Sequence, residues 1–126
     1  MLAKYRAYAT IPAKDIARAK KWYADKLGIA PESEGEYGAM YRLAGGTGFM
    51  LYPTENAGKA PNTLMGFVST DVEKDVAALK AKGVKFEEYD MPGLKTVKSI
   101  AKFGDSMAAW FKDSEGNILS IGDEPG

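Results

Sequence analysis

Residues 15–28 carry the sequence Asp15-Ile-Ala-Arg-Ala-Lys-Lys-Trp-Tyr-Ala-Asp-Lys-Leu-Gly28. Its apolar side chains recur at intervals of three and four, which places them on one face of a helix: Ile16, Ala19, Tyr23 and Leu27. Asp15 is a suitable N-cap, and Gly28 supplies a C-terminal stop. We therefore predict an amphipathic helix here, preceded by a strand over residues 5–11.

The same pattern occurs a second time further along the chain. Residues 64–69 predict a strand, and residues 71–83 predict a helix with Val72, Val76 and Leu79 on its apolar face. Thr70 with Glu73 resembles a capping box, and Asp71 is an alternative N-cap. Each helix precedes further strand patterns, over 37–43 and 47–52 in the first case and over 84–89, 97–103, 107–111 and 118–121 in the second. The first helix is thus followed by two strand patterns and the second by four, and we interpret the chain as the order strand, helix, three strands, repeated twice.

Composition and charge exclude several classes of protein. The 126 residues favour one domain, and seventeen Lys+Arg balance seventeen Asp+Glu. This neutral balance disfavours nucleic acid and membrane surfaces as partners. The absence of cysteine and histidine excludes disulfides, thiol nucleophiles, histidine-based zinc sites and histidine-containing triads. With no transmembrane-length run and no signal-peptide pattern, we expect a soluble, cytoplasmic protein.

The segment 15–28 resembles the first helix of the vicinal oxygen chelate superfamily, which includes glyoxalase I, bleomycin-resistance proteins and extradiol dioxygenases. The segment Trp110-Phe-Lys-Asp-Ser-Glu-Gly-Asn-Ile-Leu-Ser120 resembles the penultimate hairpin and last strand of that family. The resemblance implies an α+β fold in which two βαβββ repeats form a curved mixed sheet around a concave cleft, with the helices outside. It implies a single domain over residues 1–126, with repeats at about 4–53 and 64–123 and a connector over 54–63. It also implies a homodimer.

In metal-dependent members of the family, four strand positions carry ligands to the metal. Carried over by the resemblance, these positions fall on Tyr8, Met50, Met65 and Ser120, with a shift of one or two residues open at Met65. Hard divalent cations prefer carboxylate or amide oxygen and imidazole nitrogen, whereas thioethers suit soft ions. We therefore expect neither a bound metal nor another cofactor.

Strand alternation adds further residues to the expected cleft: Arg6, Thr10, Gly48, Tyr52, Phe67, Ile118 and either Trp110 or Phe111. Aromatic rings, thioethers and a few hydroxyls form pockets for apolar, planar ligands. We therefore expect Tyr8, Met50, Met65, Ser120, Arg6, Tyr52, Phe67 and Trp110 to bind a hydrophobic or aromatic small molecule. The alternative that these side chains fill an ordinary core, with Arg6 reaching solvent, stays open.

Three functions remain compatible with these residues. The first is a resistance-protein-like role, in which the cleft binds or sequesters a small molecule without catalysis. The second is a glyoxalase- or lyase-like enzyme that is metal-independent or uses an unconventional metal site, with Tyr8 as the acid–base group. The third is an interaction module whose cleft is filled by its own side chains.

Overall fold

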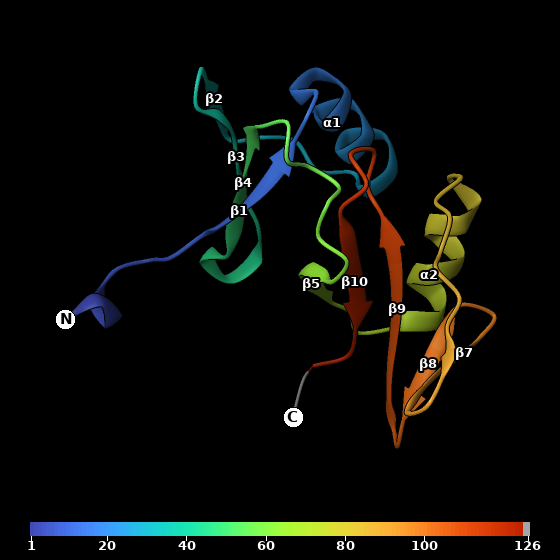
Figure 1. Ribbon diagram of the computed structural model, residues 1–126. Helices are drawn as coiled ribbons and strands as arrows, with labels where there is room; N and C mark the ends of the chain where they lie inside the picture. The colour runs from blue at the N-terminus through green and yellow to red at the C-terminus, as the bar shows by residue number, and fades with distance from the viewer. Residues whose placement is uncertain (125–126) are drawn as a thin grey trace.

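The structure, a computed structural model, describes residues 1–124 and contains two successive units that each begin with a strand and a helix (Figure 1). The first unit follows a short 3-10 turn at Leu2–Lys4 and comprises β1 (Ala9–Ala13), α1 (Ile16–Trp22), the π-helical turn η2 (Tyr23–Leu27), β2 (Ser33–Gly35), β3 (Gly38–Arg42), the 3-10 turn η3 (Ala44–Gly46) and β4 (Gly48–Pro53). The second unit comprises β5 (Thr63–Val68), α2 (Val72–Ala81), β6 (Asp90–Met91), β7 (Leu94–Val97), β8 (Ile100–Phe103), β9 (Ser106–Lys112) and β10 (Ile118–Gly122).

Both predicted helices are confirmed, and both begin at an aspartate. The carboxylate of Asp15 accepts a hydrogen bond from the Arg18 amide at 3.0 Å, and Asp71 accepts one from the Lys74 amide at 3.1 Å. A carboxylate at this position satisfies one of the free amides of the first turn. The first helix changes to π-helical hydrogen bonding over its second half before it ends at Gly28. Among residues 1–124, no helix combines the length and the apolar character needed to cross a membrane.

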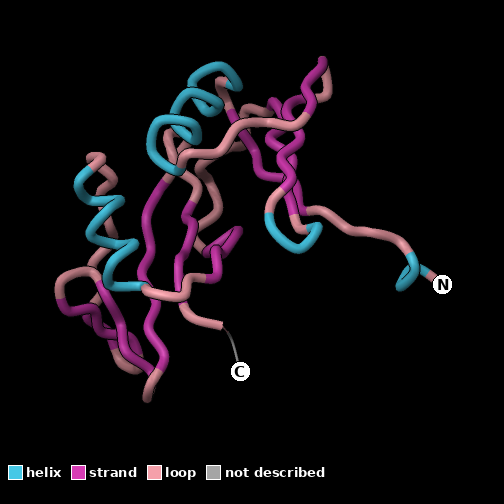
Figure 2. The backbone as a smooth tube through the Cα atoms, turned by 180° about the vertical axis from the view of Figure 1, so that it is seen from behind, coloured by secondary structure: helices cyan, strands magenta, loops and turns pink. Residues whose placement is uncertain are grey.

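The first strand begins later than the sequence predicts. Residues 5–8 belong to an extended, exposed N-terminal arm that projects from the body of the molecule, as Figure 2 shows from behind. Only Ala9–Ala13 pair with β4, in parallel, so the prediction is wrong for residues 5–8. Pro12 lies within the strand because β1 is an edge strand of its sheet, where a missing backbone donor interrupts no ladder.

The strand pattern over residues 84–89 is also not confirmed as a strand. Phe86 alone forms an isolated bridge, to Phe111 of β9. The predicted strand over 97–103 is confirmed only as β8 (Ile100–Phe103), because Lys98 and Ser99 form a tight turn with positive φ and Val97 ends β7, which begins before the predicted range at Leu94. The remaining predicted strands are present within one or two residues of their expected bounds.

Each unit forms its own mixed sheet. The strand order is β1-β4-β3-β2 in the first sheet and β5-β10-β9-β8-β7-β6 in the second. The pairs β1–β4 and β5–β10 are parallel and occupy equivalent places, which confirms the α+β fold and its internal repeat. Within residues 1–124 no ladder joins the two sheets, and β1 and β5 each form a free edge.

The helices cover one face of each sheet, and the buried side chains form one shared core. In the first sheet, Tyr41 and Phe49 stack with ring centroids 4.6 Å apart, beneath Tyr23 of the first helix. Trp22 stacks on Phe111 of the second sheet with centroids 6.3 Å apart. The first helix therefore packs against both units, and side chains on the opposite face of each sheet are left to build a site.

Candidate functional site

The uncovered face of the first sheet carries several of the residues expected in the cleft. Its register pairs Met50 with Thr10 and Met40, and Tyr52 with Pro12. Because the intervening residues of β4 are fully buried on the helix side, Met50 and Tyr52 face away from the helix. Both side chains are half-buried.

Arg6 and Tyr8 approach this face from the N-terminal arm. They line a small pocket of about 340 Å³ with Met40, Arg42 and Gly48. The side chain of Tyr8 is 56% exposed, so its phenol is accessible from solvent. The structure therefore brings Arg6, Tyr8 and the residues of β3 and β4 to one side of the first sheet.

The uncovered face of the second sheet carries Ser120 and Trp110, which are register partners. Trp110 packs edge-on against Tyr89, with ring centroids 5.6 Å apart at an angle of 78°. Phe111, the alternative to Trp110, is buried in the core. Ser120 also lies opposite Gly66, where an added Cβ would come within 2.8 Å of the Ser120 hydroxyl oxygen.

Met65 and Phe67 lie on the other face of β5. They pair with Leu119 and Ile121, which are buried beneath the helices. The cause is a shift of one residue in the pairing: Ile118 pairs with Thr63 and Leu119 with Met65, which leaves Leu64 of β5 as an extra residue. Such a shift exchanges the faces of every side chain in a strand. In this register Gly66, not Met65, is the partner of Ser120, so the position expected for the third metal ligand falls on Gly66.

The four positions have no ligand set for a hard cation. After the shift they are Tyr8, Met50, Gly66 and Ser120, which offer a phenol, a thioether, no side chain and an alcohol. Within residues 1–124, acidic side chains nowhere gather in the groups of three or more that hold a metal ion. The residues present do not fit the Mg²⁺, Zn²⁺ or Fe²⁺ preference for carboxylate and imidazole donors.

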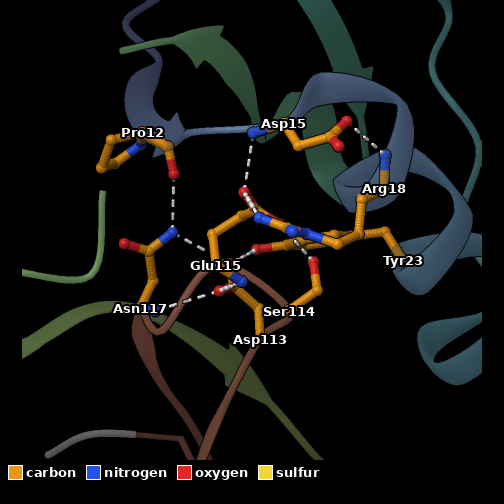
Figure 3. A network of polar contacts seen from close by, with 8 residues as sticks. All are labelled: Pro12, Asp15, Arg18, Tyr23, Asp113, Ser114, Glu115 and Asn117. Carbon is orange, nitrogen blue, oxygen red and sulfur yellow. Dashed lines mark hydrogen bonds and ion pairs between the residues drawn. The ribbon is translucent and has the colours of Figure 1, made fainter. Parts of the chain in front are cut away.

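A buried polar network ties the two units together behind these faces (Figure 3). The carboxylate of Asp113 accepts hydrogen bonds from the Tyr23 hydroxyl at 2.6 Å, the Glu115 amide at 2.8 Å, and the Asn117 amide and side chain at 3.0 Å. The Asn117 side chain donates in turn to the Pro12 carbonyl at 2.7 Å. Burial and the Asp113 carboxylate raise the pKa of Tyr23 far above its usual range, so its hydroxyl stays a donor.

Glu115 is the second centre of this network, and its side chain is completely buried. It accepts hydrogen bonds from the Asp15 amide at 2.8 Å, from Nε and Nη2 of Arg18 at 2.9 and 3.0 Å, and from the Ser114 hydroxyl at 2.8 Å. Burial alone would raise the pKa of this carboxyl. The donors and the Arg18 charge outweigh burial and lower the pKa of Glu115 to about 2.

We expect this carboxylate to make folding stability dependent on acidity. The pKa of Glu115 is about 2 in the folded chain against an ordinary value of 4.5, so the unfolded chain binds the proton more readily. The stabilisation is complete above about pH 4.5 and is lost as pH falls toward 2, on the order of 3 kcal/mol in total. Urea denaturation between pH 2.5 and 7 measures it. In Glu115→Gln the free energy of unfolding is expected to be lower at pH 7 and to change less over this range; equal slopes for both proteins would contradict the assignment.

Residues 6–121 match the protein family described as the Glyoxalase/Bleomycin resistance protein/Dioxygenase superfamily. Solved structures share the fold at low sequence identity. UcmS2 has a TM-score of 0.73 and 20% identity, covering 95% of this chain and all of its own. A glyoxalase / bleomycin resistance protein from Catenulispora acidiphila has a TM-score of 0.67 and 20% identity, covering 97% of this chain and all of its own.

A third structure of the same fold is TnmS3, an antibiotic-binding protein from Streptomyces sp. CB03234. Its TM-score is 0.63 and its identity 18%, with 99% of each chain covered. No curated protein matches the sequence significantly. At these identities the structural likeness establishes the fold, and the chemistry must be argued from this chain's own residues.

Proposed function

We propose that this chain, which belongs to the Glyoxalase/Bleomycin resistance protein/Dioxygenase superfamily, binds a hydrophobic or aromatic small molecule without a metal ion. The observation that carries the proposal is the donor set at the four ligand positions, namely Tyr8, Met50, Gly66 and Ser120. A site without carboxylate or imidazole cannot polarise a substrate through a hard cation. We therefore place its function in binding or sequestration, in the cytoplasm.

The side chains on the two uncovered faces support an apolar, planar ligand. Tyr52 and Trp110 offer ring surfaces, and Met50 offers an adaptable thioether. Aromatic and thioether groups contact flat ligands over large areas without imposing one geometry. A fold shared with an antibiotic-binding protein agrees with this ligand class by analogy only.

We also propose that the complete cleft forms in a homodimer. Met50 and Tyr52 lie on the first sheet, and Trp110 lies on the second, with no ladder between those sheets within residues 1–124. Both sheets end in a free parallel edge strand, and exposed apolar side chains flank those edges, with Val68 60% exposed. Unpaired edges beside exposed apolar groups favour association with another copy.

The metal-independent enzyme is the second candidate, because Arg6 and Tyr8 line the same pocket. A phenol can move a proton, and a neighbouring guanidinium can stabilise an oxyanion. If the protein is this enzyme, it turns over a substrate, and Tyr8→Phe abolishes that turnover while the substrate still binds. If the protein binds a ligand without turning it over, and Tyr8→Phe leaves the binding affinity unchanged, sequestration is favoured.

The binding proposal is tested with the neutral fluorescent amine N-phenyl-1-naphthylamine and protein labelled with carbon-13 at its methionine methyl groups. We expect saturable fluorescence and a shift of the Met50 methyl resonance, both unchanged by EDTA. Tyr52→Ala is expected to raise Kd about tenfold, because the lost ring contact contributes about 1.4 kcal/mol. Tyr37→Ala, which removes an exposed ring from the β2–β3 turn, is the matched control. An unmoved Met50 signal, or binding that requires Zn²⁺ or Ni²⁺, contradicts the proposal.

A further inference from the structure

A second concave region lies on the helix side of the second sheet and is lined by residues of α2, the β7–β8 hairpin and β9. Figure 1 shows α2 near this hairpin. We call this concave region the lysine groove; its volume is about 600 Å³, within the range of small-molecule sites. Its floor is apolar and consists of Val76 from α2, Ile100 from β8 and Met107 from β9. Because all three pack on the helix side of the sheet, the groove is separate from the face that carries Ser120 and Trp110.

The walls of this groove carry an excess of positive charge. Lys80, Lys95, Lys98 and Lys102 line it, and Glu73 is its single acidic residue. Within residues 1–124, none of these lysines forms an ion pair. The ion pairs among these residues use other lysines and arginines. In a chain whose total charge is zero, such a local surplus favours an anion.

The hairpin turn beside the groove is held in an unfavourable conformation. Lys98 and Ser99 have φ values of 52° and 76°, and two-residue turns of this kind normally use Asn-Gly. Glu88 accepts hydrogen bonds from the Ser99 amide at 3.1 Å and from its hydroxyl at 2.7 Å, while Nζ of Lys80 donates to the Lys98 carbonyl at 3.3 Å. These contacts fix the turn and keep Lys98 at the groove, and backbone strain of this kind is concentrated at functional sites.

We propose that the lysine groove binds an amphipathic carboxylate, with its alkyl chain on Val76, Ile100 and Met107 and its charged group among the lysines. An apolar floor beneath several cations matches a ligand that is apolar at one end and anionic at the other. This site is independent of the ligand proposed for the cleft.

Sodium decanoate tests the proposal, with decyltrimethylammonium as a probe of similar chain length and opposite charge. In protein labelled at its methionine methyl groups, Met107 reports on the groove and Met50 reports on the cleft. We expect decanoate to shift Met107 saturably and the cation to leave it unchanged. Lys95→Gln/Lys102→Gln is expected to raise Kd for decanoate about tenfold, because each exposed charge contributes modestly.

The matched control is Lys59→Gln/Lys74→Gln, which removes the same charge from exposed positions outside the groove. It is expected to leave Kd within twofold. An unmoved Met107 signal, equal binding of both probes, or equal weakening in both double variants would overturn the proposal. A shift confined to Met50 would overturn it as well while supporting a ligand site in the cleft.

Discussion

Replacing Asp113 with alanine is expected to lower the free energy of unfolding by about 3–5 kcal/mol. The substitution leaves the Tyr23 hydroxyl and the amides of Glu115 and Asn117 without their acceptor in the buried centre of the molecule. Each unpartnered buried donor loses its hydration without compensation. Because a whole domain is stable by only about 5–15 kcal/mol, this one side chain accounts for a large share of its stability.

Urea denaturation of single and double variants measures this contribution. Tyr23→Phe removes one of the donors and is expected to cost about 1–2 kcal/mol, and the Tyr23→Phe/Asp113→Ala pair is expected to be strongly non-additive. Asp105→Ala provides the matched control, because Asp105 lies in an exposed turn between β8 and β9. It is expected to change stability by less than about 0.5 kcal/mol. Additive losses would show that Asp113 and Tyr23 act separately.

The helices could be predicted from the sequence because their signals are local. Asp15 and Asp71 cap helices whose apolar residues recur within a few positions, and Gly28 ends the first within the same segment. The sequence pattern places the start of the first strand too early, because pairing with a neighbouring strand decides where a strand begins. Residues 5–8 alternate like a strand, yet they form no ladder pair, because the pairing with β4 begins only at Ala9 and Phe49.

The composition of the candidate site was predictable, but the direction of its side chains was only partly so. Alternation along β4 places Met50 and Tyr52 together, as expected from the sequence. For Met65 and Phe67 the outcome depends on how β5 pairs with β10, more than fifty residues away: Leu64 is left unpaired, and the alternation within β5 does not reveal this. A register shift of one residue reverses the faces of a strand.

The buried polar network around Asp113 and Glu115 is not predicted from the sequence, for a similar reason. Asp113 and Glu115 have the sequence context of turn residues, and both lie in a tight turn between β9 and β10. Their partners Tyr23 and Arg18 precede them by 90 and 97 residues. One signal was available: a tyrosine on the apolar face of the first helix buries a hydroxyl that needs an acceptor.

The second large effect is expected for Gly38→Ala, at the first residue of β3. Gly38 has a φ of +127°, a conformation that side chains other than glycine rarely adopt. An added Cβ would overlap the carbonyl oxygen of Leu51, which is a backbone atom of the neighbouring strand and cannot move aside. We expect a loss of about 3–5 kcal/mol, combining backbone strain with displacement of β3 from β4.

Gly45→Ala separates these two causes. Gly45 also has a positive φ, +67°, but no atom lies within 4 Å of the position that its Cβ would occupy. Its substitution is therefore expected to cost only about 1 kcal/mol, the strain of a left-handed residue. Urea denaturation of both variants gives the difference between their free energies of unfolding. A larger loss in Gly38→Ala, accompanied by weaker ligand binding, would show that close approach of β3 and β4 maintains the face that carries Met50; equal losses would attribute the whole effect to backbone conformation.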